Sequence, residues 1–297
     1  MNKLKVPVKW AAERIIRAVM RFRGWKFPEY FVLRDKWQAL TGGVERDLQL
    51  LASRTMIPGE TVLDIGANAG LISRHFAHCV GPGGRVLAFE PEPGNVDALK
   101  FNLRRLPWAC VYEMALSDTN EVATFYLNCV SGTGNSLVPH ALGTREIKVR
   151  CQTLDEFLAK NQDVRPDWIK IDVEGAEPRV LRGMQKTVRN FPEVRLLIEL
   201  CPANLGGMEQ AAQLVMEIKK MDFQVFLINM DGSTSPFLGV TSHSDSLARH
   251  GYFNIYCARA RGGVTDEGNK GACTFVSQER WQATQQWECE FWRHTER

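Results

Sequence analysis

Acidic residues at the ends of short apolar runs are the side chains in this sequence best suited to chemistry. Asp64 and Glu90 each lie at the end of a run rich in β-forming residues, and Asp172 and Glu174 lie at the end of a third. Ligands of doubly wound sheets bind outside the carboxyl ends of the strands, so Asp64, Glu90 and Asp172 converge on one crevice if the third strand neighbours the first. Two simpler interpretations stay open. Lys170 only pairs with Asp172, or Glu174 only caps the following helix.

A turn bracketed by Gly66 and Gly70 follows the first of these runs. Glycine lets the backbone turn sharply and lets a ligand come close, and the first N–H groups of a helix favour an anion. Glu90 is placed to accept two hydrogen bonds from a ribose diol. A dinucleotide fingerprint has glycines where this chain has Asn68 and Leu71, so we expect a nucleoside ligand without pyrophosphate, namely S-adenosylmethionine. The alternative is a tight turn in an α/β domain that binds no nucleotide.

The order of apolar runs and turn signals predicts one α/β domain over residues 43–260. Its sheet is doubly wound and mostly parallel, with an antiparallel strand near the carboxyl end. The expected strands are 61–65, 85–89, 109–116, 168–173, 194–200, 223–228 and 252–257, and the expected helices are 43–56, a helix from about 70, and 95–105, 178–190 and 207–221. Runs 122–127 and 147–151 alternate as exposed-face strands, and the Gly- and Ser-rich stretch 128–144 between them is a candidate lid.

The composition is that of an ordinary globular protein, because 44% of the 297 residues are hydrophobic and 24% are charged. No apolar run is long enough to cross a membrane. The eight cysteines show no C-x-x-C pair and no zinc spacing, and apolar runs around Cys110 and Cys257 indicate buried thiols. We therefore expect a reducing, cytoplasmic location and no metal site. Residues 261–297 form a Trp-rich tail that we expect to pack on its own domain.

Residues 1–42 form a basic amphipathic segment. Its first 27 residues contain one acid, Glu13, and the basic residues Lys3, Lys5, Lys9, Arg14, Arg17, Arg21, Arg23 and Lys26. The apolar residues that recur at helical spacing are Val8, Ala12, Ile15, Val19 and Phe22. The helix lies on an anionic membrane surface, at the inner membrane face, or binds nucleic-acid phosphates, or packs its apolar stripe on the domain. Arginines interrupt any apolar core, so the segment is not a secretory signal.

Six blocks of the sequence, in chain order, are 62–70, 89–91, 115–118, 134–137, 153–158 and 169–177. Together they resemble the FkbM family of S-adenosylmethionine-dependent methyltransferases over residues 60–230. The resemblance implies a class I, Rossmann-like methyltransferase fold and O-methylation of a hydroxyl on a sugar, glycolipid or polyketide-type natural product. It also implies which residues hold the cofactor: Asp64, Gly66, Asn68 and Gly70 the methionine end, with Ala67 in the same loop, Glu90 the ribose, and Ala115 and Leu116 the adenine.

Methyl transfer to a hydroxyl needs a base, or a metal, to take the proton. Asp172 and Glu174 are the candidates for catalysis, followed by His140, and no spacing requires a metal. The Asn/Asp-Pro-Pro-aromatic signature of amino methyltransferases and the Pro-Cys pair of cytosine chemistry are both missing, which favours oxygen as the acceptor atom. The expected partner is a small-molecule or glycan hydroxyl acceptor.

Two alternatives to this function remain. One is an RNA-directed methyltransferase, disfavoured because the aromatic stacking pattern of single-strand readers is lacking. The other is a non-catalytic S-adenosylmethionine-binding interaction module.

Overall fold

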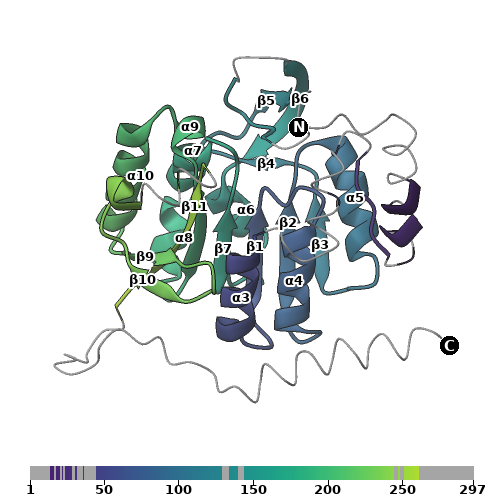
Figure 1. Ribbon diagram of the computed structural model, residues 1–297, viewed down its shortest axis with the longest axis horizontal. Helices are drawn as coiled ribbons and strands as arrows, with labels where there is room; N and C mark the ends of the chain where they lie inside the picture. The colour runs from purple at the N-terminus through teal and green to yellow at the C-terminus, as the bar shows by residue number, and fades with distance from the viewer. Residues whose placement is uncertain are drawn as a thin grey trace, which may run out of the picture.

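The computed structural model describes residues 14–16, 18–20, 22, 24–28, 31, 36, 45–128, 134–139, 144–243, 247 and 251–260. Its centre is an eight-stranded sheet with the strand order β10-β9-β11-β8-β7-β1-β2-β3 (Figure 1). These strands are β1 (Thr61–Ile65), β2 (Arg85–Phe89), β3 (Ala109–Tyr112), β7 (Trp168–Ile171), β8 (Arg195–Leu200), β9 (Gln224–Ile228), β10 (Thr234–Pro236) and β11 (Phe253–Ala258). Strands β3, β2, β1, β7 and β8 run parallel, whereas β11 is antiparallel to both β8 and β9. The predicted doubly wound, mostly parallel sheet is confirmed.

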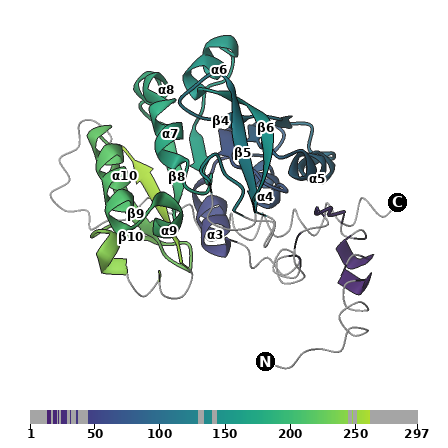
Figure 2. The same cartoon turned by 90° about the horizontal axis from the view of Figure 1, so that it is seen from above.

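Helices cover both faces of this sheet (Figure 2). One face packs against α3 (Arg46–Thr55), α4 (Leu71–Val80) and α5 (Pro93–Leu103). The other face packs against α6 (Leu154–Lys160), α7 (Glu177–Arg182), α8 (Gln185–Asn190) and α10 (Met208–Lys220). The short helices α9 (Pro202–Leu205) and η1 (Val240–His243), like β10, have no counterpart in the predicted elements.

Each central strand is apolar on both sides because a parallel sheet is covered on both faces. In β1, Leu63 and Ile65 belong to the core beneath α6–α8 and α10, whereas Val62 belongs to the core beneath α3–α5. Helix α4 fits this second core because Ile72 and Phe76, spaced four residues apart, point to the same side. The alternation of strand side chains thus creates two separate cores around one sheet.

A second sheet of three strands lies at the top of Figure 1, over β1 and β2. It contains β4 (Ala115–Leu116), β5 (Val122–Asn128) and β6 (Thr144–Gln152) in the order β4-β6-β5. The two alternating runs are therefore strands, and they pair antiparallel. The prediction of one continuous strand over 109–116 is wrong. The chain leaves the main sheet after β3, and Ala115 pairs instead with Cys151 of β6 and joins a separate small core.

Two other expectations need correction. The predicted helix 178–190 is divided into α7 and α8 at Gly183, where the chain passes close to the backbone of Ser117. Cys257 is buried as expected, but Cys110 is exposed because β3 is an edge strand of the sheet. The tail 261–297 lies outside the described residues. Within the described part of the chain, no helix combines the length and apolar character needed to cross a membrane.

Candidate functional site

An open cleft lies where the carboxyl ends of β1, β2 and β7 meet the small sheet. The predicted site residues in its wall are Gly66, Asn68, Glu90, Ala115, Leu116, Asp172 and Glu174. Asp64, Ala67 and Gly70 are buried and are not part of that wall. The candidate lid stretch contributes Gly134, Asn135 and Leu137. His140 lies outside the described residues.

The loop between β1 and α4 forms one side of the cleft, and its backbone is tied to β2. The N–H groups of Gly66 and Ala67 both donate to the carbonyl of Phe89, at 3.0 Å each. Asn68 has a φ of 51°, which is uncommon for a residue with a side chain, and its N–H donates to Glu90 Oε2 at 2.8 Å. The loop therefore carries Asn68 into the cleft in a conformation that the Glu90 carboxylate helps to hold.

Two loop positions accept only glycine. Gly66 has a φ of +82°, and a Cβ there would lie 1.8 Å from the carbonyl oxygen of Asp172. Gly70 has a φ of +84°, and a Cβ there would lie 2.5 Å from Leu99 Cδ1 on α5. The first glycine lets the loop cross the end of β7, and the second lets α4 begin directly against α5.

Glu90 lies deep in the cleft, only 4% exposed. Its Oε1 accepts a hydrogen bond from the N–H of Glu92 at 2.9 Å, in addition to the bond from Asn68 to Oε2. Burial raises the pKa of this carboxyl to about 7 despite these donors. Asn95 Nδ2 also donates to Oε1, at 3.4 Å, so three of the about four acceptor positions of the carboxylate are in use and the free one is on Oε2. A ribose diol would take that position with one hydroxyl and replace the long Asn95 contact with the other.

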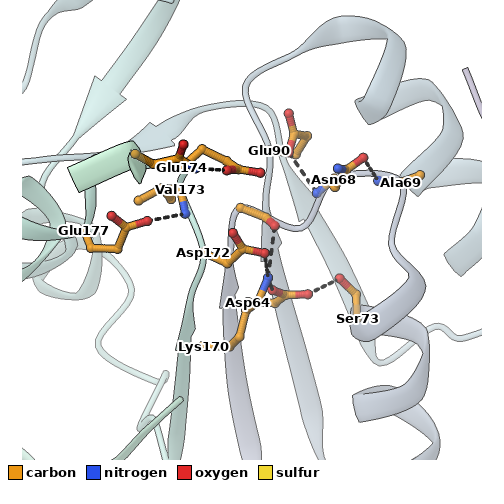
Figure 3. Close-up of polar contacts among 12 residues, drawn as sticks. Asp64, Asn68, Ala69, Ser73, Glu90, Lys170, Asp172, Val173, Glu174 and Glu177 are labelled. Atoms are coloured by element: carbon orange, nitrogen blue, oxygen red, sulfur yellow. Dashed lines mark hydrogen bonds and ion pairs between the residues drawn. The ribbon is translucent and has the colours of Figure 1, made fainter. Parts of the chain in front are cut away.

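Beneath the loop, Lys170 is a buried cation between two carboxylates (Figure 3). Its Nζ lies 3.5 Å from Asp64 Oδ1, 3.0 Å from Asp172 Oδ2 and 3.3 Å from the carbonyl of Gly66. Burial alone would lower the pKa of Lys170, but the two carboxylates raise it well above its ordinary value. Strand β7 does neighbour β1, so the predicted convergence of the acids is confirmed, and the Lys170–Asp172 pair forms as well.

Asp64 itself is held from the other side by Ser73 of α4, whose Oγ donates to Asp64 Oδ2 at 2.5 Å. Within the described part of the chain its Oδ1 accepts no hydrogen bond, and the Lys170 ammonium lies 3.5 Å away. The carboxylate is fully buried. Asp64 therefore supports the loop from below.

Glu174 reaches into the cleft from the loop after β7, and its carboxyl group points toward the side where Glu90 and Asn68 lie (Figure 3). Its φ of 55° is again unusual, and Asn204 Nδ2 donates to its Oε2 at 2.5 Å. Burial, followed by the charges of Asp172 and Glu177, raises the pKa of Glu174 to about 8. The interpretation of Glu174 as a helix cap is wrong.

The carboxylate that binds the backbone before α7 is that of Glu177. It accepts from the N–H of Val173 at 3.1 Å and from the N–H of Gly175 at 3.0 Å. The Glu174 carboxyl group is thereby left to face the cleft. Its neighbour Asp172 contacts Lys170, so the two acids at the end of β7 have different surroundings.

Two further acids lie near Asp172, and sequence reasoning missed both. The register pairs Ile171 with Ile198, so Glu199 is the next residue of β8 beside Asp172. Burial and the charges of Asp172 and Glu174 raise the pKa of Glu199 well above its ordinary value. Glu45, directly before α3, has its pKa raised to about 8 by burial and the nearby carboxylates. Neither follows an apolar run at a glycine turn, so only sheet register could have indicated Glu199.

Apolar side chains complete the wall, and they too were missed. Met114 precedes β4, Phe125 lies in β5 and Leu137 lies in the stretch after β5. Ser136 anchors this stretch, because it bridges to Tyr126 and its Oγ donates to the carbonyl of Val173 at 3.1 Å. The sequence block 134–137 was the available signal for this wall.

Comparison with known proteins identifies the class and the family. The family model described as "Methyltransferase FkbM domain" matches residues 64–225, more than half of the chain. The fold and the cleft are those of an S-adenosylmethionine-dependent methyltransferase with a Rossmann-like sheet. The chain belongs to the FkbM methyltransferase family.

Two relatives and one solved structure illustrate the range of likeness. Hexuronic acid methyltransferase AglP of Haloferax volcanii is 26% identical over 60% of this chain and 73% of its own length. The 31-O-demethyl-FK506 methyltransferase FkbM of Streptomyces tacrolimicus is 30% identical over 48% of this chain and 65% of its own length. The precorrin-6y C5,15-methyltransferase of Geobacter metallireducens superposes with a TM-score of 0.44 at 11% identity, covering 80% of this chain and 94% of that chain.

Proposed function

We propose that this methyltransferase transfers the methyl group of S-adenosylmethionine to a hydroxyl oxygen of a sugar, glycolipid or polyketide-type small molecule. The names of two relatives support an acceptor of this class, one a hexuronic acid and the other a demethylated oxygen of FK506. The observation in this chain that carries the proposal is the Glu174 carboxyl group, which faces the cleft with a pKa of about 8. A group with such a pKa is well matched to accept a hydroxyl proton near neutral pH.

In this proposal the cofactor lies along the loop between β1 and α4. Glu90 accepts the ribose hydroxyls, Gly66 and Asn68 border the methionine end, and Ala115 and Leu116 border the adenine. Asp64, Ala67 and Gly70 act from behind the wall by fixing the shape of the loop. The bound cofactor supplies an electrophilic methyl group, so the chain mainly has to hold the acceptor oxygen in line with it and exclude water.

Glu174 is the proposed general base, in preference to Asp172. Asp172 forms an ion pair with the buried Lys170 ammonium, so its carboxylate is already engaged. Among the described residues no cation contacts the Glu174 carboxyl group, whose Oε2 accepts from the amide of Asn204. Asp172 then has the role of holding negative charge beside the cofactor's sulfonium group.

The charge around the end of β7 also bears on the acceptor. Asp172 and Glu174 line the cleft, and Glu199 lies beside them, with Lys170 as the cation in their midst. The pKa values of Glu174 and Glu199 are raised, so both groups are largely protonated near neutral pH, and Lys170 offsets the charge of Asp172. We therefore propose that a sugar acceptor with a carboxylate is tolerated, as the hexuronic acid in the name of one relative also suggests.

The test is methyl transfer from S-adenosylmethionine carrying a ¹³C methyl group to methyl glucoside, glucosamine and glucuronic acid. The proposal predicts an O-methyl product with one or more of these sugars. Glu174→Gln is expected to lower kcat by about 100-fold or more, with the cofactor Kd within about twofold. Glu92→Gln is the matched control, because Glu92 is buried nearby but is not part of the wall. Methylation on nitrogen, or full activity of Glu174→Gln, would refute the assignment.

We also propose that the amino-terminal segment contacts an anionic membrane surface. Ile15, Val19 and Phe22, part of the predicted apolar stripe, are 64%, 40% and 84% exposed, whereas Ile16 and Met20 are buried. The packing of this helix on the domain therefore uses Ile16 and Met20 and leaves these three stripe residues exposed. Exposed apolar side chains among basic residues fit the headgroup region of anionic lipids. A peripheral location at the inner membrane face follows from this proposal.

Co-sedimentation of the full-length protein with phosphatidylglycerol vesicles tests this proposal. We expect binding that weakens with salt and is absent with phosphatidylcholine alone. Combined replacement of Ile15, Val19 and Phe22 by serine should abolish it. Equal binding of the variant and the wild type would contradict the proposal.

A further inference from the structure

A short segment near the amino terminus packs against the loop between β1 and α4, which we call the cofactor loop. It consists of residues 24–28 together with Phe31, and we call it the strap. Phe31 is 5% exposed and shares a small core with Ala69 of the loop and Ala98 of α5, against which Phe27 also packs. This segment lies outside the residues matched by the family model, so the family assigns it no role.

Two side chains of the domain hold the start of the same segment. The guanidinium of Arg74, in α4, lies 4.3 Å from the ring centroid of Trp25. Arg104 Nη1 donates to the carbonyl of Gly24 at 3.2 Å. The strap is thus attached to α4, which follows the cofactor loop, and to the end of α5, which packs against that loop at Gly70.

The centre of this arrangement is Asn102, a side chain of α5 that is 3% exposed. Its Oδ1 accepts from the N–H of Lys26 at 2.7 Å, and its Nδ2 donates to the carbonyl of Lys26 at 2.8 Å. The same Nδ2 donates to the carbonyl of Ala69 at 2.7 Å. One buried amide side chain therefore joins the strap backbone to the loop backbone, through hydrogen bonds from both its oxygen and its nitrogen.

The position of Ala69 gives these contacts a consequence for the cleft. Asn68 lies directly before Ala69, and its Oδ1 accepts from the N–H of Ala69 at 2.7 Å. The loop must hold Asn68 at a φ of 51° and Gly70 at 84°. Glu90 accepts from the N–H of Asn68 on the cleft side, and Asn102 donates to the carbonyl of Ala69 on the opposite side. Asn68, which lines the cleft, is therefore held by hydrogen bonds from both sides.

We propose that Asn102 is a positioning residue that fastens the strap to the cofactor loop, and that the strap is part of the structure that binds the cofactor. The role of Asn102 is to keep the Ala69 carbonyl in place and so keep Asn68 and its N–H directed at Glu90. Without it, the loop has to order itself when the cofactor binds, and that ordering reduces affinity. This inference rests on the proposed placement of the cofactor along the loop.

The test compares three variants of the full-length protein by calorimetric titration with S-adenosylmethionine and by thermal unfolding. Asn102→Ala removes all three hydrogen bonds. Asn102→Asp keeps an acceptor for the N–H of Lys26 but cannot donate to Ala69. Asn161→Ala is the control, because Asn161 Nδ2 donates to the backbone carbonyl of Phe157 at 2.8 Å on α6, away from the loop.

We expect both Asn102 variants to bind S-adenosylmethionine about tenfold more weakly, the effect of losing one backbone contact that orders the site. The control is expected to lower the unfolding temperature without changing the Kd. A Kd within twofold of the wild type in Asn102→Asp would overturn the proposal, even if Asn102→Ala fails to fold. Failure of the wild type to bind S-adenosylmethionine would instead overturn the proposed cofactor site.

Discussion

Cofactor affinity should depend on pH through Glu90. The pKa of this carboxyl is about 7 in the ligand-free chain, and only the ionised form can accept both ribose hydroxyls. If the ionised fraction alone is competent to bind, the apparent Kd rises about twofold at pH 7, about tenfold at pH 6 and about 100-fold at pH 5, relative to high pH. Acidification therefore weakens binding, and the cofactor in turn lowers the pKa of Glu90.

Calorimetric titration with S-adenosylmethionine between pH 5 and 7.5 measures this dependence, in buffers of different ionisation enthalpy so that proton release is counted. Neighbouring acids with raised pKa values change affinity in the same direction, so the decisive quantity is the difference between the wild type and Glu90→Gln. Below pH 6 the slope of log Kd against pH should be shallower by about one in the variant. The variant should also bind about 10- to 100-fold more weakly at pH 7.5, because a hydrogen bond to a charged group contributes about 1.5–3 kcal/mol.

Glu92→Gln is the control for this measurement, since Glu92 accepts from the N–H of Asn95 at the start of α5 but does not line the cleft. Its slope of log Kd against pH should match that of the wild type, with a midpoint at somewhat lower pH because the charge of Glu92 helps to raise the pKa of Glu90. Equal slopes for the wild type and Glu90→Gln would show that Glu90 does not titrate on binding. The assignment of Glu90 to the ribose would then be refuted.

Three further outcomes follow from the same geometry. Lys170→Met leaves two carboxylates at the cleft floor without their cation and should destabilise the chain by about 3–5 kcal/mol in urea unfolding; a loss below about 1 kcal/mol would contradict this. Gly66→Ala, at a positive φ and in contact with the β7 backbone, should cost more than about 1 kcal/mol and abolish cofactor binding, and normal titration would refute it. The pKa of Glu174 is raised in the folded state, so its stabilisation is present at low pH and lost as pH rises to about 8. The ligand-free chain should therefore lose stability between pH 6.5 and 8. This pH range lies above the one in which two buried histidines, with pKa values of about 4, affect stability. A rise in stability between pH 6.5 and 8 would contradict the prediction.

Local patterns in the sequence were sufficient for the framework of the site. Strand β2 has the predicted bounds, because a glycine turn precedes it and a proline follows it. The alternation in β7 placed Lys170 and Asp172 on one face, and the structure confirms that face against Asp64. Turn glycines and strand periodicity are properties of a few adjacent residues, so a sequence contains them directly.

Features that depend on distant segments could not be read in this way. The chain bends out of the main sheet before Ala115 because a partner strand, β6, begins almost thirty residues later. The orientation of Glu174 depends on Asn204, and the position of Glu199 depends on the register between β7 and β8. Asn102 is one polar residue on an ordinary helix until the strap is placed beside it. Tertiary contacts decide each of these features.

The most direct test of the proposed cofactor site is calorimetric titration of the full-length protein with S-adenosylmethionine and, separately, with NAD. The wild type and Glu90→Ala are compared. We predict that one S-adenosylmethionine binds per chain and that Glu90→Ala binds it at least about tenfold more weakly. We predict no binding of NAD, because the loop has Asn68 where a pyrophosphate would need glycine. Binding of NAD, or S-adenosylmethionine affinity that is unchanged by Glu90→Ala, would contradict the cofactor site described above.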